Sequence, residues 1–185
     1  MTLSELRTAF TVAGSIVERT RRFRDERLAT ITAPGGPRSY FAKPLCVFHL
    51  VPFAGMAEAV QIDFTAGQNL RKLSPLLAEP DGFIRQGDLR YNLDGVEMRQ
   101  GIDWHTQLFR NGCIEYATTV FFEQSKSPHY LNAWLYQVNV VKLLVRFSAL
   151  QRAFGIAPPV TLLLSILNAA NFHLRVSEGS PMHGE

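Results

Sequence analysis

The stretch WHTQLFRNGCIEYATTVFF, residues 104–122, decides the fold because it encodes two strands joined by a tight turn. The flanking segments, residues 104–109 and 113–122, are rich in aromatic and β-branched residues, which favour strands. Asn111 and Gly112 stand between them, and Asn-Gly is the strongest short signal of a β-hairpin because both residues tolerate positive φ. We therefore expect two adjacent antiparallel strands here.

A second hairpin precedes the first one. Residues 88–92 and 96–100 flank Asp94 and Gly95, and Asp-Gly is also a turn signal. Four further segments have the composition or the alternation of strands: residues 45–52, 59–64, 160–167 and 172–176. Together these segments predict a mainly antiparallel sheet of about six to eight strands.

Two long helices accompany this sheet in the predicted fold. Apolar residues recur at helical spacing over residues 3–31 and over residues 128–154, and Gly155 ends the second helix. The fold class is α+β, with the helices packed against one face of the sheet. Residues 1–176 are expected to form a single domain, and residues 177–185 a mobile C-terminal tail.

The composition limits the class of protein. Of the 185 residues, 46% are hydrophobic and 19% are charged, which suits one domain that needs no metal or disulfide to hold it. A net charge of +3 is well below that of a protein that coats nucleic acid. Cys46 and Cys113 lie in apolar runs and are expected to be buried free thiols. No signal peptide and no membrane-spanning run is visible, so we expect a cytoplasmic protein.

Two arginines occupy positions of the first helix that core-facing residues usually take. At about 100° per residue, Arg24 projects into the middle of the apolar stripe and Arg27 lies at its edge. A guanidinium directed at a core needs a carboxylate, a phosphate or water. The end of this helix is therefore expected to form a small polar site, with Asp94 or Asp103 as the acceptor.

The candidate binding site joins the end of this helix to the two hairpins. Nine polar residues make it up: Arg24, Arg27, Arg90, Asn92, Asp94, His105, Gln107, Arg110 and Asn111. One interpretation is a structural salt bridge that fixes the helix to the sheet, with turn residues chosen for turn geometry. The other is a pocket for a small anionic ligand, such as a phosphate or the carboxylate of a protein partner.

No catalytic signature stands out in the chain. No two of the five histidines have the spacing of a helical metal site, so we expect no metal or other cofactor. His49 is typical of a core histidine, and His105 stands on a hairpin strand without a nearby nucleophile. The pattern G-x-S-x-G and the glycine-rich phosphate loops are absent. The sequence therefore favours a protein that is not an enzyme.

Two alternatives stay open. Asp81, Glu97 and Arg99 follow the order of the acids and the basic residue that hold Mg²⁺ and phosphate in restriction-type nucleases. That function requires the three side chains to converge. Plain nucleic-acid binding, which would weaken steeply with salt, would use three arginines of the first helix: Arg19, Arg21 and Arg22.

Five segments together resemble one family. They are FRDERL (residues 23–28), CVFHLVPF (46–53), RYNLDG (90–95), TQLFRNGCIE (106–115) and APPV (157–160). In this order they are similar to the C-terminal region of bacterial proteins that carry an N-terminal Schlafen-type, Alba-like domain, to which DNA and ATP binding are assigned. That N-terminal domain has no counterpart in these 185 residues.

The resemblance implies an accessory domain of a nucleic-acid-related or defence protein, and it supplies no catalytic residue. We expect such a domain to bind a protein partner or a small anionic ligand, without contact to a membrane. The predicted strand over residues 172–176 could also pair edge to edge and form a homodimer.

Overall fold

The computed structural model describes residues 2–34, 40, 42–64, 88–100, 103–123 and 128–176. Its helices are α1 (Leu3–Thr32), the short α2 (Phe53–Met56) and α4 (Ala133–Ala153). Its strands are β1 (Leu45–Pro52), β2 (Asp88–Asn92), β3 (Gly95–Gln100), β4 (Trp104–Phe109), β5 (Ile114–Thr118), β6 (Phe122–Glu123), β7 (His129–Asn132), β8 (Val160–Leu167) and β9 (Phe172–Arg175).

The strands form two sheets. The larger sheet has six strands in the order β2-β3-β4-β5-β1-β8, and all its neighbours are antiparallel. The smaller sheet has the order β6-β7-β9, in which β7 and β9 are parallel. Both predicted hairpins, β2–β3 and β4–β5, are present. Gly112 has φ +80° at the second turn, where an added Cβ would collide with the side chain of Ile156. The predicted α+β class with a mainly antiparallel sheet is confirmed.

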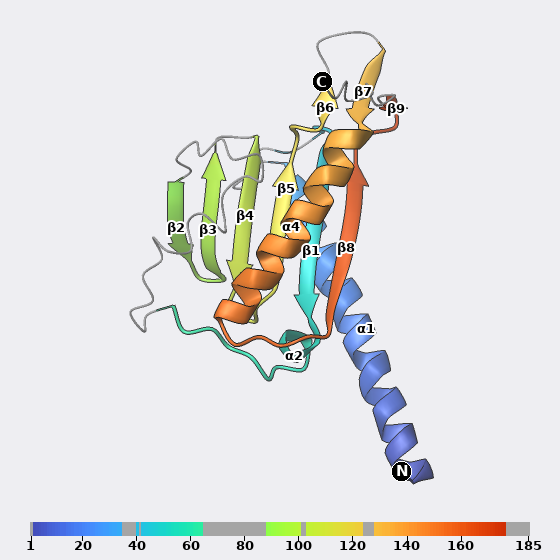
Figure 1. Ribbon diagram of the computed structural model, residues 1–185, viewed down its shortest axis with the longest axis vertical. Coiled ribbons are helices and arrows are strands. Elements are labelled where there is room, and N and C mark those ends of the chain that lie inside the picture. Colours follow the sequence, from blue (N-terminus) through green and yellow to red (C-terminus); the bar gives the residue numbers. More distant parts are fainter. Residues whose placement is uncertain are drawn as a thin grey trace, which may run out of the picture.

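The two long helices lie on opposite faces of the six-stranded sheet, with α4 in front and α1 behind in Figure 1. The expectation that the helices cover one face is wrong. Side chains alternate along a strand, and β1 shows the consequence. Phe48 packs in the cluster beneath α4 with Phe147, whereas the next residue, His49, contacts Phe23 of α1. Every residue of β1 is buried, so the strand needs a cover on both faces.

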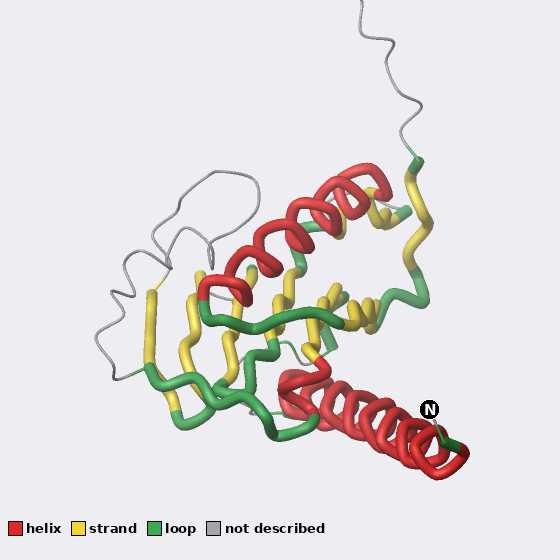
Figure 2. Tube along the Cα trace, turned by 60° about the horizontal axis from the view of Figure 1, so that its bottom comes forward, coloured by secondary structure: helices red, strands yellow, loops and turns green. Residues whose placement is uncertain are grey.

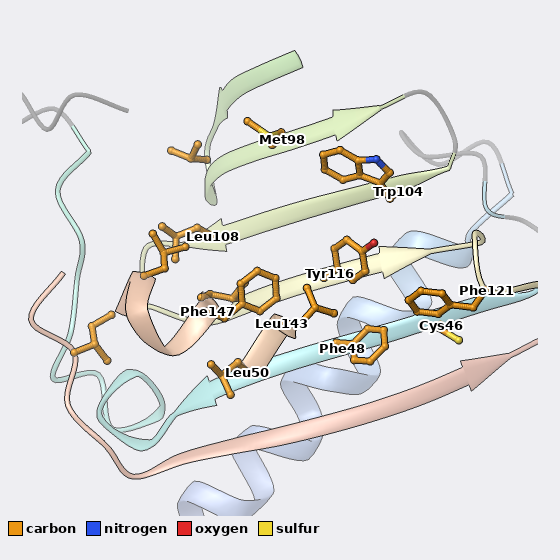
Figure 3. Close-up of a cluster of buried hydrophobic side chains, with 14 of the residues drawn as sticks. Cys46, Phe48, Leu50, Met98, Trp104, Leu108, Tyr116, Phe121, Leu143 and Phe147 are labelled. Atoms are coloured by element: carbon orange, nitrogen blue, oxygen red, sulfur yellow. The ribbon is translucent and has the colours of Figure 1, made fainter. Parts of the chain in front are cut away.

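The main hydrophobic core lies between the sheet and α4 (Figure 3). Trp104, Tyr116 and Phe48 of the sheet are at most 1% exposed and pack in one cluster with Leu143 and Phe147 of α4. The opposite face also has apolar contacts, but its centre is polar, and α1 covers it there. The N-terminal half of α1 projects beyond the sheet on the side of β8 (Figures 1 and 2).

Three predicted segments differ from the structure. Residues 59–64 form no strand, because Ile62 donates its backbone N–H to Arg110 in a turn instead of to a ladder. The helix expected from residue 128 begins at Ala133, after β7, because the Asn132 side chain caps it by accepting from the N–H of Leu135. The strand expected over 113–122 ends at Thr118. The predicted tail, residues 177–185, lies outside the described residues. Among the described helices, none is long and apolar enough to cross a membrane.

Candidate functional site: a buried carboxylate and the polar pocket beside it

A fully buried carboxylate, Glu115 of β5, is the centre of the polar face beneath α1. Arg27 of α1 donates to both of its oxygens, from Nε to Oε2 at 3.0 Å and from Nη2 to Oε1 at 3.1 Å. His105 Nε2 lies 2.8 Å from Oε1, and His49 Nε2 lies 3.1 Å from Oε2. Each oxygen is thus approached by one arginine nitrogen and one imidazole nitrogen.

The electrostatics of this cluster favour an ionised pair. Burial raises the pKa of the Glu115 carboxyl, but the hydrogen bonds from His105, His49 and Arg27 outweigh burial and hold it well below its usual range. Burial lowers the pKa of Arg27, but its hydrogen bond to Glu115 and the charge of that carboxylate more than compensate, so that the pKa is raised. A carboxylate can only accept hydrogen bonds, so both imidazoles carry a proton on Nε2.

The other imidazole nitrogens have different surroundings. His105 Nδ1 lies 3.3 Å from the hydroxyl of Tyr40, which is itself buried. His49 Nδ1 is buried and has no hydrogen-bond partner among the described residues. Its ring makes an edge-on contact with Phe23, at 5.6 Å between centroids. The expectation of a core histidine holds for the burial of His49, but the ring also belongs to the Glu115 cluster.

Strand register explains why these polar side chains meet. Glu97, Gln107, Glu115 and His49 are opposite one another across β3, β4, β5 and β1. Residues opposite one another in antiparallel strands share a face. The hairpin turns therefore place one row of polar side chains across the middle of the α1-facing side. His105 is two residues from Gln107 on the same face, which brings it to the other side of Glu115.

Arg24 and Arg27 of α1 have exchanged positions relative to the prediction, which placed Arg24 inward and Arg27 at the edge of the packed face. Arg27 is the buried one, with its side chain 14% exposed and its guanidinium carbon 4.9 Å from the centre of the Phe109 ring. Arg24 is 37% exposed and pairs with its neighbour Asp25. The acceptor of the inward arginine is Glu115, not Asp94 or Asp103.

The exchange has a physical reason. The predicted stripe combined residues from both halves of the helix, but only the second half packs on the sheet (Figure 2). In the first half Leu3 is 66% exposed and Val17 is 46% exposed. The face that packs beside Glu115, marked by Thr20 and Phe23, is rotated by roughly 80° at 100° per residue from the predicted stripe, which consisted of Leu6, Phe10, Ala13, Val17, Leu28 and Ile31. This rotation brings Arg27 to the centre of the packed face.

An open pocket of about 340 Å³ lies beside the Arg27–Glu115 pair. It is bounded by α1 and by the β2–β3 hairpin, and its lining residues are Arg27, Thr30, Asn92, Leu93, Asp94, Glu97 and Arg99. This volume is within the range of small-molecule sites, about 300–1,000 Å³. The pocket thus connects solvent to the guanidinium that holds the buried carboxylate.

Three groups of the pocket retain hydrogen-bonding or ionic capacity. The side chains of Asp94 and Arg99 have no hydrogen bond or ion pair within the part of the chain that the structure describes. Arg27 uses Nε and Nη2 for Glu115, and its Nη1 makes no hydrogen bond to the described residues. Asn92 is already engaged, because its Nδ2 donates to Gln107 Oε1 at 2.7 Å and its Oδ1 accepts from the N–H of Gly95. The pocket therefore holds one carboxylate and one guanidinium that are not paired with each other.

The structure brings together some of the nine predicted residues and not others. Arg27, Asn92, Asp94, His105 and Gln107 line the pocket or belong to the polar row beside it. The remaining four residues form ion pairs or hydrogen bonds at the surface or in the hairpin turns. Arg90 pairs with Asp88, Arg110 donates to the backbone oxygen of Leu93, Asn111 accepts from the N–H of Cys113, and Arg24 pairs with Asp25.

The residues of the two alternative functions are also placed in part. Glu97 and Arg99 line the pocket together, but Asp81 lies outside the described residues, so the nuclease alternative stays a prediction. Within the described ranges no cluster of three His, Cys, Asp or Glu side chains could hold a metal ion. Two of the three helix arginines already have carboxylate partners: Arg19 pairs with Glu58, and Arg22 pairs with Glu26.

Sequence reasoning missed Glu115, although a signal was available. The residue stands between Ile114 and Tyr116 in a strand that the hairpin prediction placed inside the sheet. A turn of three residues pairs Leu108 with Ile114, so Gln107 is opposite Glu115. An acidic side chain at such a position needs a cation, and this requirement would have directed attention to the arginines of α1.

Comparisons of the chain with family models, with curated proteins and with solved structures found no match. The resemblance to the C-terminal region of Schlafen-associated bacterial proteins therefore stays a prediction.

Proposed function

We propose that the protein is a binding domain whose polar pocket takes a small zwitterion, a molecule with an ammonium group and a carboxylate or phosphate. The observation that carries this proposal is the pair of opposite charges, Asp94 and Arg99, that line one pocket and make no hydrogen bond or ion pair among the described residues, although the charge of Asp94 also acts on Arg27. Two opposite charges that line the same pocket without forming an ion pair with each other are suited to a ligand that carries the complementary charges.

The charges of the groups that line the pocket favour a zwitterion over a simple anion as the ligand. Of the two guanidinium groups in the pocket, that of Arg27 is already compensated by Glu115. The pocket also contains the carboxylates of Asp94 and Glu97. An anion would thus meet Arg99 and the remaining Nη1 donor of Arg27, but also the repulsion of two carboxylates. A molecule with an added ammonium group would turn that repulsion into attraction.

The spacing of the two charges indicates the size of the ligand. From Gly95 to Arg99 the strand advances four residues, roughly 13 Å at 3.3 Å per residue. The long Arg99 side chain shortens the distance that a ligand has to bridge. A chain of about four carbons that carries the ammonium group at one end and ends in the carboxylate is therefore a suitable probe, and 4-aminobutyrate has this form.

The buried cluster has a positioning role in this proposal. Two hydrogen bonds and two histidines fix the Arg27–Glu115 pair in one geometry. Nη1 of Arg27 is therefore already oriented before a ligand binds, and the side chain loses little conformational entropy on binding. Preorganised groups lose less entropy on binding than mobile ones. The hydroxyl in the pocket lining, that of Thr30, donates to the backbone oxygen of Glu26, and we propose binding without turnover.

A matched set of four-carbon compounds tests the proposal by isothermal titration calorimetry. The set is 4-aminobutyrate (both charges), butyrate (anion only) and butylamine (cation only). We expect measurable heat of binding for 4-aminobutyrate and at least tenfold weaker binding of the other two. Saturating ligand should also raise the melting temperature, since a ligand at 100 times its Kd stabilises by about 2.7 kcal/mol.

Variants of the two charged residues supply the controls. Arg99→Gln and Asp94→Asn each remove one charge from the pocket, and both are expected to weaken 4-aminobutyrate binding at least fivefold. Arg22→Gln removes an arginine of α1 that is 77% exposed and outside the pocket, and it should bind like the wild type. Equal binding of butyrate and 4-aminobutyrate would show that the pocket takes a simple anion and would contradict the proposed zwitterion. Absence of binding by all three compounds would favour a protein partner.

A further inference from the structure

The free edge of β8 is the largest unused hydrogen-bonding surface of the described sheet. β8 is the terminal strand of the order β2-β3-β4-β5-β1-β8, and within the described residues no strand pairs with its outer side. Its eight residues, VTLLLSIL, include no charged side chain. Proteins usually protect such edges with lysine, proline or a bulge inside the strand. Leu164 and Ile166 are instead 44% and 45% exposed.

The projecting half of α1 lies on the side of this free edge (Figures 1 and 2). It exposes Leu3 and Val17, and the sequence places Leu6, Phe10 and Ala13 at the same helical spacing. On the α1 side of the sheet, Val17 and Thr20 line a hollow together with Thr161 and Leu163 of β8, so a strand added to β8 would lie beside this part of α1. The helix arm and the strand edge thus point to the same occupant.

We propose that β8 pairs in antiparallel fashion with β8 of a second copy of this chain, around a two-fold axis at Leu164. The choice of a second copy rests on self-complementarity. With the axis at Leu164, Leu162 is opposite Ile166 of the copy, and Leu164 is opposite Leu164 of the copy. All three positions face the α4 side, because their partners on β1 include Leu50, Phe48 and Cys46 of the core beneath α4.

On the α1 side of the sheet, the residues of β8 are also compatible with pairing to a second copy. There Thr161 is opposite Leu167 of the copy, and Leu163 is opposite Ser165. Thr161 and Leu163 line a hollow of about 120 Å³ between α1, α2 and β8, which is walled mainly by apolar side chains. In this hollow the hydroxyl of Thr20 is buried and has no hydrogen-bond partner among the described residues. An isologous contact of this kind closes on itself as a dimer.

A stable dimer needs more area than the edge of β8 alone provides. A lasting interface needs roughly 800 Å² from each copy. One strand edge of eight residues offers a projected face of only about 26 Å by 10 Å. The arms must supply the rest, and a two-fold axis perpendicular to the sheet places both arms on the same face.

Sedimentation velocity of the full chain at 5–100 µM, as an order-of-magnitude range around common dimer affinities, tests the proposal. We expect a dimer for the wild type and a monomer for Leu164→Lys, which places two like charges at the axis. Val141→Lys is the matched control, because Val141 is an apolar residue of α4 that is 63% exposed. It should remain dimeric. Circular dichroism melting shows that both variants are folded, as exposed positions allow.

Oxidative cross-linking tests the register. Leu164→Cys should form a disulfide-linked dimer, because a residue at the axis faces itself at a distance that a disulfide spans. Leu162→Cys should not, because its nearest copy of itself lies about 13 Å away along the strand. The natural thiols do not interfere, since Cys46 and Cys113 are buried.

Three results would overturn the proposal. A wild type that is monomeric at 100 µM would do so, as would a dimer that Leu164→Lys leaves intact. A monomer in which the outer amides of β8 are protected from hydrogen exchange would assign this edge to another segment of the same chain.

Discussion

Arg27 and Glu115 are 88 residues apart in the sequence and form a two-pronged ion pair that fixes α1 to the centre of the sheet. The carboxylate is fully buried, and two histidines complete its surroundings. A buried ion pair of this geometry tolerates the loss of neither partner, because the remaining charge would be left in an apolar interior. The pair therefore links the stability of the domain to the pocket that Arg27 lines.

Substitution of the carboxylate should strongly destabilise the protein. In the wild type, nitrogen donors approach both oxygens of Glu115. In Glu115→Gln the amide has only one acceptor oxygen, and its NH₂ group faces the N–H groups that bonded to the other oxygen. We expect the free energy of unfolding to fall by about 3–5 kcal/mol, measured by urea denaturation followed by tryptophan fluorescence. A loss below 1 kcal/mol would show that the cluster contributes little to folding.

The two arginines of the first helix should behave differently. Arg27→Met removes a buried guanidinium that is bonded to Glu115 and stacked on Phe109, and should cost about 3–5 kcal/mol. Arg24→Met removes an exposed ion pair and should change stability by less than about 1 kcal/mol. Methionine and arginine have similar helix propensities, so the comparison isolates the contacts. Equal effects of the two substitutions would contradict the assignment of Arg27 as the inward residue.

Acid should remove the contribution of Glu115. Its folded-state pKa is depressed, so its stabilisation is fully present above the unfolded-state pKa of about 4.3 and is lost as the pH falls through the folded-state pKa. The difference in unfolding free energy between the wild type and Glu115→Gln should therefore shrink as the pH falls below about 4.3. Chemical denaturation at each pH measures it. A difference that grows on acidification would have the wrong sign.

The two thiols should be unreactive in the folded protein. Burial raises the pKa of Cys46 to about 12, and burial also raises the pKa of Cys113, although a hydrogen bond with Asn111 opposes it. We expect Ellman's reagent at pH 8 to label neither thiol in the native state and both after denaturation in urea. Rapid labelling of one thiol without denaturant would show that its strand opens easily.

Much of the fold could be predicted because local signals are strong where they occur. Asn111-Gly112 and Asp94-Gly95 fix both hairpins, and the long apolar periodicity identifies α1 and α4. The layer arrangement could not be predicted, because a fully apolar strand such as β1 shows that both faces are covered but not by which helix. The extended residues 59–64 also have the alternation of a strand, and only their tertiary hydrogen bonds exclude them from the ladder.

The candidate site could be predicted only in outline. The expectation of a guanidinium inside the helix–sheet interface was correct, but its identity depended on a rotation of the helix that the first, unpacked half of α1 obscured. Glu115 was not assigned, and His49 was expected to be a core histidine outside the site, because only the strand register shows that these two side chains lie side by side. Asp94 was named as an acceptor for an arginine; it lines the pocket without a hydrogen bond or ion pair among the described residues, and its charge acts on Arg27.

The most direct test of the proposed zwitterion pocket is a titration of the ¹⁵N-labelled protein with 4-aminobutyrate, followed by two-dimensional NMR. We expect saturable shifts of the amides of residues 92–99 and of the Nε–H of Arg27, with both sets reduced in Arg99→Gln. No saturable shift, or shifts confined to residues outside the pocket, would contradict it.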